Sequence, residues 1–282
     1  MFCALFFAAL AFAAPDAQLA FETADGLVGT CTPRDAGTAG GHRAAEFLFK
    51  AARNAGADVR KDVFRAPTPD GDRTFVNLVA EFRSSETNAP WVIFVSHFDT
   101  KPGCGCPGAN DGASTSGLLV ALAKTLAGRR DLKGNVMLLW TDGEECMRKY
   151  GESDGFWGSR RAAARVAARK LNVRAVVCLD MLGDKDLRIT LPANGTPTLA
   201  RTVLQAARRA GHQDLVSPAA MWVKDDHVAF LDCGYPAVDL IDFSYGPDNA
   251  YWHTPQDTMD KVSESSLLKV GQIAAELLNI LL

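Results

Sequence analysis

Two adjacent glutamates, Glu144 and Glu145, follow an apolar run that extends from Val136 to Trp140. Such a run is typical of a buried strand, and sites in α/β folds are built where strands end. Adjacent carboxylates at a strand end can divide the work of catalysis, since one can bind a metal ion while the other moves protons. A lone Glu-Glu pair is more often a solvated turn, so this interpretation depends on metal-type residues elsewhere in the chain.

Acidic residues and histidines also follow the other apolar runs or lie in glycine-rich and proline-rich loops. They are His97, Asp99, Asp111, Asp180, Asp225, Asp226, His227 and His253. Any one of them alone is more often structural. Oxygen and imidazole ligands together suit zinc, which keeps three protein ligands and one open position in a catalytic site. The set therefore predicts a zinc-dependent enzyme.

With these motifs the chain resembles the zinc exopeptidase superfamily, which holds aminopeptidases and glutaminyl cyclases. The resemblance runs from about Pro33 to the C-terminus. It rests on His97-Phe98-Asp99, Asn110 to Ser114, Glu144-Glu145, Gly158-Ser159, Asp180, Asp226-His227 and His253-Thr254.

The spacing after the glutamate pair separates the two groups of enzymes. Twelve residues lie between Glu145 and Gly158. The aminopeptidases keep only a few residues there, whereas the animal-type glutaminyl cyclases carry an insertion of this length followed by Gly-Ser-Arg, here Gly158 to Arg160. The closer resemblance is therefore to the glutaminyl cyclases.

That resemblance implies a glutaminyl-peptide cyclotransferase, which converts the N-terminal glutamine of peptides and proteins to pyroglutamate and releases ammonia. It implies one zinc ion per chain, held by Asp111, Glu145 and His253. Glu144 would be the general acid and base. Asp180 and Asp225 correspond to carboxylates that hydrogen-bond around this base, and neighbouring carboxylates raise its proton affinity.

Trp252 and Tyr150 are the expected walls of the substrate pocket. Trp252 stands beside the proposed ligand His253, although ordinary packing explains it equally well. Tyr150 stands where animal cyclases have a tryptophan, and Asp239 stands where they have a histidine, which puts the hydrogen-bond network of the site in doubt. We expect the pocket to accept N-terminal glutamine largely regardless of the residue that follows.

Two alternatives stay open. A two-zinc aminopeptidase would use Glu144 to activate a water between the metals, and Asp99 would orient His97. Its five ligands are all present: His97, Asp111, Glu145, Asp180 and His253. A non-enzymatic binding domain is disfavoured, because Glu144 and the three proposed zinc ligands are intact.

Alternating strand and helix patterns predict an α/β fold, a single-domain three-layer sandwich with a largely parallel mixed sheet, helices on both faces and the zinc site at the carboxyl ends of the strands. The domain would span residues 33–282. Loops 101–110, 146–157 and 242–251 would surround the mouth of the site. Expected strands are 58–64, 75–82, 92–95, 136–140, 173–179 and 237–241, and expected helices are 41–55, 114–126, 159–171, 198–210 and 263–281.

The composition is that of an ordinary globular protein, with 282 residues, 48% hydrophobic residues and a formal net charge of −3. Nothing in this charge favours binding to nucleic acid or to an anionic membrane. Residues 1–14 are apolar and end in an Ala-Phe-Ala pattern, which predicts a secretory signal and hence export to the periplasm or the exterior, although the usual basic start is missing. The run is too short for stable membrane insertion.

Beyond that segment six cysteines remain, an even number that permits disulfides in an exported protein without revealing their pairing. Cys104-Gly105-Cys106 is not a zinc spacing, and a bridge between these two would be strained. The resemblance implies that a disulfide of the animal cyclases is absent, because Ser96 stands at one of its cysteine positions.

Overall fold

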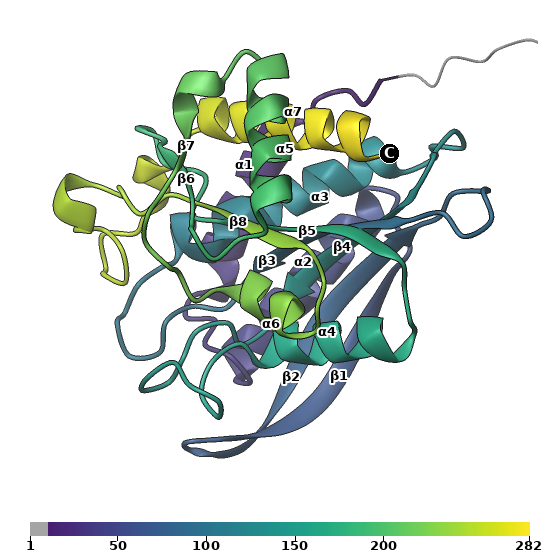
Figure 1. Ribbon diagram of the computed structural model, residues 1–282. Helices are drawn as coiled ribbons and strands as arrows, with labels where there is room; N and C mark the ends of the chain where they lie inside the picture. The colour runs from purple at the N-terminus through teal and green to yellow at the C-terminus, as the bar shows by residue number, and fades with distance from the viewer. Residues whose placement is uncertain (1–10) are drawn as a thin grey trace, which may run out of the picture.

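An eight-stranded sheet with helices on both faces forms the frame of the computed structural model, which describes residues 11–282 (Figure 1). The strand order is β1-β2-β4-β3-β5-β8-β6-β7. The strands are β1 Val59–Thr68, β2 Gly71–Phe82, β3 Trp91–His97, β4 Asn135–Thr141, β5 Val173–Asp180, β6 Ile189–Leu191, β7 Val216–Pro218 and β8 Ala237–Ile241.

The middle of the sheet is parallel, and antiparallel pairs flank it on both sides. Strands β4, β3, β5 and β8 all run in one direction, whereas β1 and β2 form a hairpin and β6 pairs antiparallel with β8. The hairpin turns at Pro69 and Asp70, and Gly71 accepts the left-handed φ of 97° that the turn requires. The mixed, largely parallel sheet predicted from the sequence is confirmed.

The central strands are apolar on both faces because helices cover both. On β4, Val136, Leu138 and Trp140 belong to one core, while Met137 and Leu139 belong to the other. Helices α4 Trp157–Ala168 and α6 Asp226–Asp232 cover the second core. The first core is covered by α1 Ala17–Cys31, α2 Ala39–Asn54, α3 Thr115–Leu126, α5 Pro197–Arg209 and α7 Glu264–Leu281.

The carboxyl ends of the parallel strands lie at one edge of the sheet. His97 ends β3 and pairs in register with Thr141, which ends β4. Asp180 ends β5, beside Ile241 at the end of β8. Polar residues at these ends are thereby brought close together, as expected for a site in an α/β fold.

Every strand and helix expected from the sequence is present, with ends shifted by a few residues. The short elements β6, β7 and α6 were not predicted, and neither was α1. Ala20, Ala24 and Leu27 of α1 are fully buried in the first core, so the folded unit begins before residue 33. Most of the expected signal segment, 1–14, lies outside the described residues.

Among residues 11–282, no helix is long and apolar enough to cross a membrane.

Helix α1 packs so closely on α3 that only glycine fits at the contact. A Cβ atom at Gly117 would lie 2.2 Å from the carbonyl oxygen of Ala20. Gly117→Ala should therefore lower the free energy of unfolding by about 1–3 kcal/mol, as for other overpacked sites. Urea or guanidinium unfolding measures the change.

The matched control is Gly29→Ala in α1, where an added Cβ meets nothing within 4 Å. It should raise stability by about 0.5–1 kcal/mol, because alanine is the better helix former. Equal stability of Gly117→Ala and the unmodified protein would show that α1 moves away freely and that the close contact is unimportant.

Candidate active site

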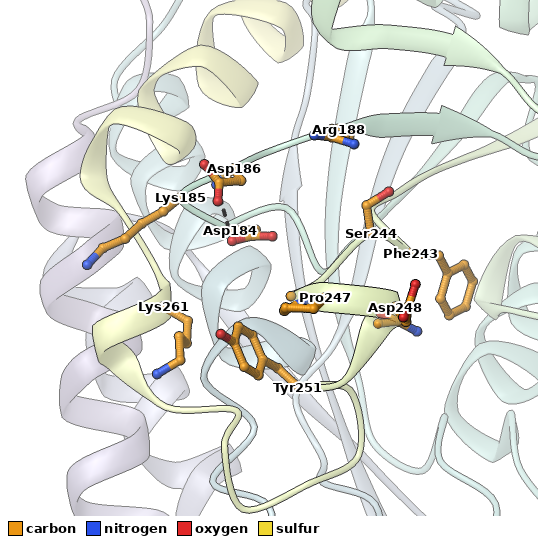
Figure 2. A pocket seen from close by; sticks show the side chains of 12 residues that line it. Asp184, Lys185, Asp186, Arg188, Phe243, Ser244, Pro247, Asp248, Tyr251 and Lys261 are labelled. Carbon is orange, nitrogen blue, oxygen red and sulfur yellow. Dashed lines mark hydrogen bonds between the residues drawn. The ribbon is translucent and has the colours of Figure 1, made fainter.

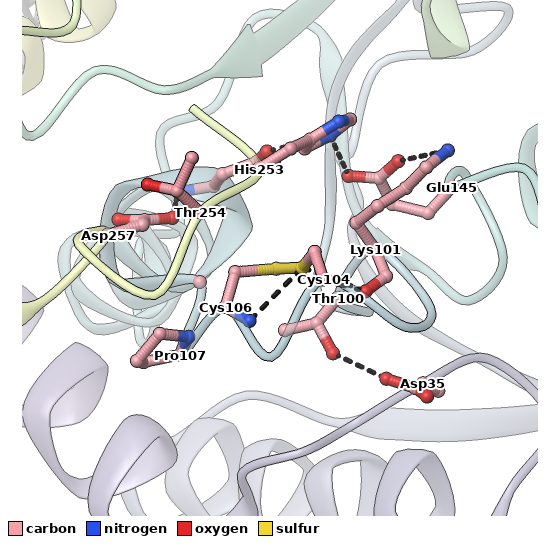
Figure 3. The surroundings of a disulfide bond; sticks show 12 residues. Asp35, Thr100, Lys101, Cys104, Cys106, Pro107, Glu145, His253, Thr254 and Asp257 are labelled. Carbon is pink, nitrogen blue, oxygen red and sulfur yellow. Dashed lines mark hydrogen bonds and ion pairs between the residues drawn. A yellow bond between two sulfur atoms is a disulfide. The ribbon is translucent and has the colours of Figure 1, made fainter. Parts of the chain in front are cut away.

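Three side chains from separate loops meet at the carboxyl edge of the sheet. Asp111 lies in a π-type turn, Ala109–Ser114, ahead of α3; Glu145 follows β4; and His253 lies in the loop before α7. The Nε2 atom of His253 is 2.7 Å from Oε1 of Glu145 (Figure 3). The same atom is 3.3 Å from Oδ2 of Asp111. Their ligand atoms lie within 4.8 Å of one another, as a metal centre requires.

Asp111 also belongs to a second cluster. The Nε2 atom of His97 is 3.1 Å from Oδ1 of Asp111 and 3.1 Å from Oδ1 of Asp180. These three residues also offer ligand atoms within 4.8 Å of one another. The structure thus brings together all five residues of the predicted ligand sets, with the Asp111 carboxylate shared between two clusters.

Asp99 holds the turn that carries the two glutamates. Its Oδ1 atom accepts hydrogen bonds from the backbone N–H of Gly143 (2.9 Å) and Glu144 (3.1 Å), and its Oδ2 atom accepts one from Glu145 (3.1 Å). The sequence suggested that Asp99 orients His97, but Nδ1 of His97 is 3.6 Å from Oδ1 of Asp99, beyond a normal hydrogen bond. Asp99 therefore acts mainly on the glutamate turn.

Asp257, which sequence reasoning missed, holds the turn that carries Asp111, as Asp99 holds the turn of the two glutamates. This buried carboxylate accepts from the backbone N–H of Asn110 at 2.8 Å and of Asp111 at 3.3 Å, and from the hydroxyl of Tyr245 at 2.7 Å. Burial, and then the charge of Asp111, raises the pKa of Asp257 to about 6. The only signal in the sequence is its place in the turn four residues after His253.

Gly112 allows the chain to approach the His97 ring. A Cβ atom there would lie 2.4 Å from the carbonyl oxygen of His97 and 2.8 Å from ring atoms Cε1 and Nε2. No larger residue fits without moving His97. The glycine in the Asn-Asp-Gly segment therefore keeps Asp111 and His97 in contact.

Tyr150 lies over both glutamates and comes from the segment between Glu145 and Gly158. Its hydroxyl donates to Oε2 of Glu145 at 2.8 Å and lies 3.2 Å from Oε2 of Glu144. Asp154, a second residue missed from the sequence, shapes this segment. It accepts backbone N–H groups of residues 147, 148 and 149 at 2.7–2.9 Å.

Burial, followed by the charge of Glu145, raises the pKa of Glu144 well above its ordinary value. Lys101 partly offsets the acidic charge, with its Nζ atom 3.5 Å from Oε2 of Glu145 and 4.9 Å from the centre of the Tyr150 ring. A buried carboxylate with raised proton affinity can accept and return a proton near neutral pH.

Two further acids, Asp180 and Asp225, line the same hollow as Glu144. Burial is the first cause that raises the pKa of Asp180 and of Asp225 to about 6 each. Asp180 contacts His97, and Asp225 accepts a hydrogen bond from Sγ of Cys178 at 3.3 Å. Asp225 acts on Glu144 through its charge, which helps to raise the Glu144 pKa.

Asp239 on β8 is fully buried, and no N–H or O–H group in the described part of the chain donates a hydrogen bond to its two oxygens, whereas the carboxylate of Asp225 lies close by. Burial, followed by the charges of Asp225 and Asp180, raises the pKa of Asp239 well above its ordinary value. This carboxyl is therefore most stable when protonated.

The site opens into a hollow of about 250 Å³. Trp252 lines it and stacks on His253 with ring centres 4.0 Å apart. Tyr150, Asp180 and Asp225 line it too, as does a loop from Met221 to Lys224 that the sequence did not reveal. The expected wall residues Trp252 and Tyr150 thus lie at the same hollow as Glu144, Glu145 and Asp111.

A larger hollow of about 910 Å³ shares Phe243 with this one (Figure 2). Most of its lining is charged or polar, and none of the candidate metal clusters lies in it. The smaller hollow is therefore the candidate active site.

Cys104 and Cys106 form a disulfide in the loop beside His253 and Lys101 (Figure 3). A bridge across one residue was not expected from the sequence. Gly103 and Gly105 have φ values of 78° and 65°, a left-handed backbone that turns the chain and lets the two sulfurs meet. The other cysteines of the described chain, Cys31, Cys146, Cys178 and Cys233, are free.

The protein combines a mixed α/β sheet with clusters of aspartate, glutamate and histidine at the C-terminal ends of its strands. This combination is typical of metal-dependent exopeptidase-like enzymes. Residues 77–278 match the model of Peptidase family M28, and the chain belongs to this family. The resemblance to the zinc exopeptidase superfamily inferred from the motifs is thereby confirmed.

Several proteins similar to this chain are named glutaminyl cyclases or glutaminyl-peptide cyclotransferases. The chain is 26% identical over 254 residues to a glutaminyl-peptide cyclotransferase of Drosophila melanogaster, covering 80% of this chain and 70% of that protein. It resembles the crystal structure of an Acidobacteriales bacterium glutaminyl cyclase with a TM-score of 0.87 and 29% identity, covering 100% and 98% of the two chains. A Porphyromonas gingivalis glutaminyl cyclase gives a TM-score of 0.85 and 25% identity, covering 95% and 99%.

Asp99→Ala should weaken metal binding about 10–100-fold, the usual effect of removing a group that supports a ligand. The reason is that three backbone N–H groups of the glutamate turn lose their acceptor. Competition for zinc with a chromogenic chelator measures the affinity, and circular dichroism verifies the fold.

Asp62→Ala is the matched control. Asp62 is also a buried carboxylate, but it pairs with Arg161 and Arg165 of α4, away from the cluster. This variant should lose stability and keep its zinc affinity. Zinc binding by Asp99→Ala as tight as that of the unmodified protein would contradict the role given to Asp99.

Proposed function

We propose that this protein is a zinc-dependent glutaminyl-peptide cyclotransferase, an acyltransferase that converts N-terminal glutamine to pyroglutamate and releases ammonia. The observation that carries the proposal is the position of Tyr150. The long segment after Glu145 brings the Tyr150 hydroxyl within hydrogen-bonding distance of Glu144 and Glu145 and forms part of the wall of a hollow of about 250 Å³. The names of the relatives support the same reaction.

Asp111, Glu145 and His253 would hold the zinc ion. Their carboxylate and imidazole groups are the donors that zinc accepts, and three protein ligands leave one position open. The charge of the site fits a cation as well. Buried acids outnumber the basic groups around them: the acids are Asp111, Glu144, Glu145, Asp180, Asp225, Asp226 and Asp239, and the basic groups are Arg34, His97, Lys101 and His253.

When bound, zinc supplies Lewis acidity that polarises the γ-carbonyl of the substrate glutamine. Glu144 accepts a proton from the α-amino nitrogen as that nitrogen attacks the γ-carbonyl carbon. Glu144 then gives a proton to the departing amide nitrogen, which leaves as ammonia. The raised pKa of Glu144, caused first by burial and then by Glu145, suits it to both transfers.

Asp180 and Asp225 keep the surroundings of Glu144 acidic. In the proposed role they sustain its proton affinity through charge, and the pKa of each is raised to about 6, first by burial. Their direct hydrogen bonds go to His97 and Cys178. Asp239 is a further acid close to Asp225. The sulfur of Cys178 and one carboxylate oxygen each of Asp225 and Asp239 lie within 4.8 Å of one another.

Trp252, Tyr150 and Phe243 form the apolar walls around the substrate glutamine. Ligand pockets commonly measure about 300–1,000 Å³, so a hollow of about 250 Å³ fits one side chain with the adjacent amine. A substrate that fills a hollow of this size would keep water from competing with the α-amine, which is a requirement of cyclisation over hydrolysis.

A two-zinc aminopeptidase is the second candidate, and the cluster of His97, Asp111 and Asp180 favours it. Incubation with a Gln-initiated peptide and a Leu-initiated chromogenic amide separates the two reactions. Cyclisation releases ammonia and lowers the peptide mass by about 17 Da, the leaving group of an acyl transfer. Release of free leucine would indicate the peptidase.

We also propose that residues 1–14 direct export of the chain. The support is the apolar composition and the Ala-Phe-Ala pattern at residues 11–13. N-terminal sequencing of protein recovered outside the cytoplasm tests this.

The proposal predicts one zinc ion per chain when the protein is purified without added metal. Elemental analysis should show that His253→Ala loses the ion and that His97→Ala keeps it, because only His253 belongs to the proposed ligand set. Thermal melting verifies that both variants are folded. Two tightly held ions, one of them lost in His97→Ala, would instead support the aminopeptidase.

Glu144→Gln should lower kcat for a Gln-initiated peptide by about 10²–10⁴-fold, the usual contribution of a general acid and base. Zinc content should stay unchanged, since Glu144 is not a proposed ligand. Glu152→Gln, an exposed position in the same insertion, is the matched control and should keep full activity. Near-normal turnover by zinc-loaded Glu144→Gln would remove Glu144 from the mechanism.

A further inference from the structure

Two large apolar side chains lie exposed beside the proposed catalytic groups. Among the described residues, the exposed large hydrophobics are Val63 (57%), Met221 (51%), Trp222 (81%) and Leu268 (40%). Met221 and Trp222 are consecutive, and both line the hollow that holds Glu144 and Glu145. An apolar surface concentrated at one place commonly marks a binding site.

The backbone around Trp222 is fixed on both sides. The carbonyl of Met221 accepts from the backbone N–H of Ala193 at 2.9 Å. The N–H of Val223 donates to Oδ1 of Asn194 at 3.1 Å, and Nδ2 of Asn194 donates to the Val223 carbonyl at 2.8 Å. The Val223 side chain is itself buried. Trp222 is thus exposed on a well-anchored loop.

His227 completes this anchor. Its Nε2 atom lies 3.0 Å from Nδ2 of Asn194, and burial lowers the pKa of His227 to about 4. A neutral ring can accept a hydrogen bond from the Asn194 amide, which then presents its oxygen to Val223. The histidine of the Asp226-His227 motif therefore supports the loop of Trp222 and lies outside the two proposed metal clusters.

The buried part of the hollow is acidic, whereas its exposed part is apolar. The floor carries Glu144, Glu145 and Asp111, whereas the exposed or half-buried lining includes Met221, Trp222, Phe243 and Trp252. A substrate whose glutamine fills the hollow must carry its second residue outward, because the hollow holds about one side chain. That second side chain then meets apolar surface.

We propose that Trp222, together with Met221, binds the side chain of the residue that follows the N-terminal glutamine, and that the enzyme prefers an apolar residue there. This inference rests on the proposed cyclase function and specifies its substrate class. It differs from the expectation from the sequence that the following residue is largely ignored, and the experiment below decides between the two. The larger hollow beside Phe243 offers no such surface, since its lining is mostly charged or polar (Figure 2).

The test compares four peptides that differ only in their second residue: Gln-Phe, Gln-Leu, Gln-Gly and Gln-Asp, each followed by the same two residues and a C-terminal amide. Ammonia release gives kcat/KM for each. For the unmodified protein, the ratio of Gln-Phe to Gln-Gly should be about tenfold, which corresponds to about 1.4 kcal/mol.

Trp222→Ala should reduce this ratio to less than about threefold, because the apolar partner is removed, whereas Trp222→Phe should keep most of it. Leu268→Ala is the matched control, since Leu268 is also exposed but lies on α7, and its ratio should equal that of the unmodified protein. Thermal melting checks that each variant is folded.

Equal kcat/KM values for all four peptides in the unmodified protein would overturn the inference while leaving the cyclase proposal standing. An undiminished ratio in folded Trp222→Ala would also overturn it. Absence of ammonia from every peptide would overturn the cyclase proposal itself, and with it this inference.

Discussion

Buried aspartates that accept backbone N–H groups shape the loops of the site. Asp99 takes three such groups from the glutamate turn, Asp257 takes two from the Asp111 turn, and Asp154 takes three from the insertion. Bonds of this kind to a charged acceptor are roughly twice as strong as those between neutral groups. The glutamate turn, the Asp111 turn and the segment that carries Tyr150 are therefore each fixed by an acid outside the proposed metal-ligand set.

Several buried acids lie close together around the site. Burial disfavours their charged form, and their pKa values are raised for that reason. Burial is the first cause that raises the pKa of Asp180 and Asp225 to about 6 and of Asp226 to about 7. Hydrogen bonds to Asp111 and Glu145 raise the pKa of His253 to about 9, although burial alone would lower it. A bound cation would relieve the repulsion among these acids and thereby favour the folded state.

The sequence predicts those parts of the molecule that depend on local pattern. Apolar runs such as Val92 to Val95 identify the central strands, and the polar residues that follow such runs, among them His97 and Asp180, lie in the candidate metal clusters. Helix α1 escaped prediction because its buried face consists largely of small residues, which give a weak apolar periodicity, although it packs against α2, α3 and α7. Strands β6 and β7 have three residues each, too few for any periodicity.

Supporting residues are harder to predict than ligands for a physical reason. Asp257 and Asp154 act on backbone N–H groups, which every residue except proline carries, so no partner in the sequence marks them. The anchored loop of Trp222 depends in the same way on Asn194, which lies 29 residues before Val223. Only the folded chain reveals such pairs.

One metal-binding skeleton can serve hydrolysis or cyclisation, and the difference lies in what surrounds it. Hydrolysis needs a water beside Glu144, whereas cyclisation needs the substrate's own amine there and the water excluded. In this protein Tyr150 occupies the space over the two glutamates, and Asp154 holds the segment that delivers it. The segment between Glu145 and Gly158 would thus change the chemistry by changing access to Glu144, while leaving the proposed metal ligands Asp111, Glu145 and His253 in place.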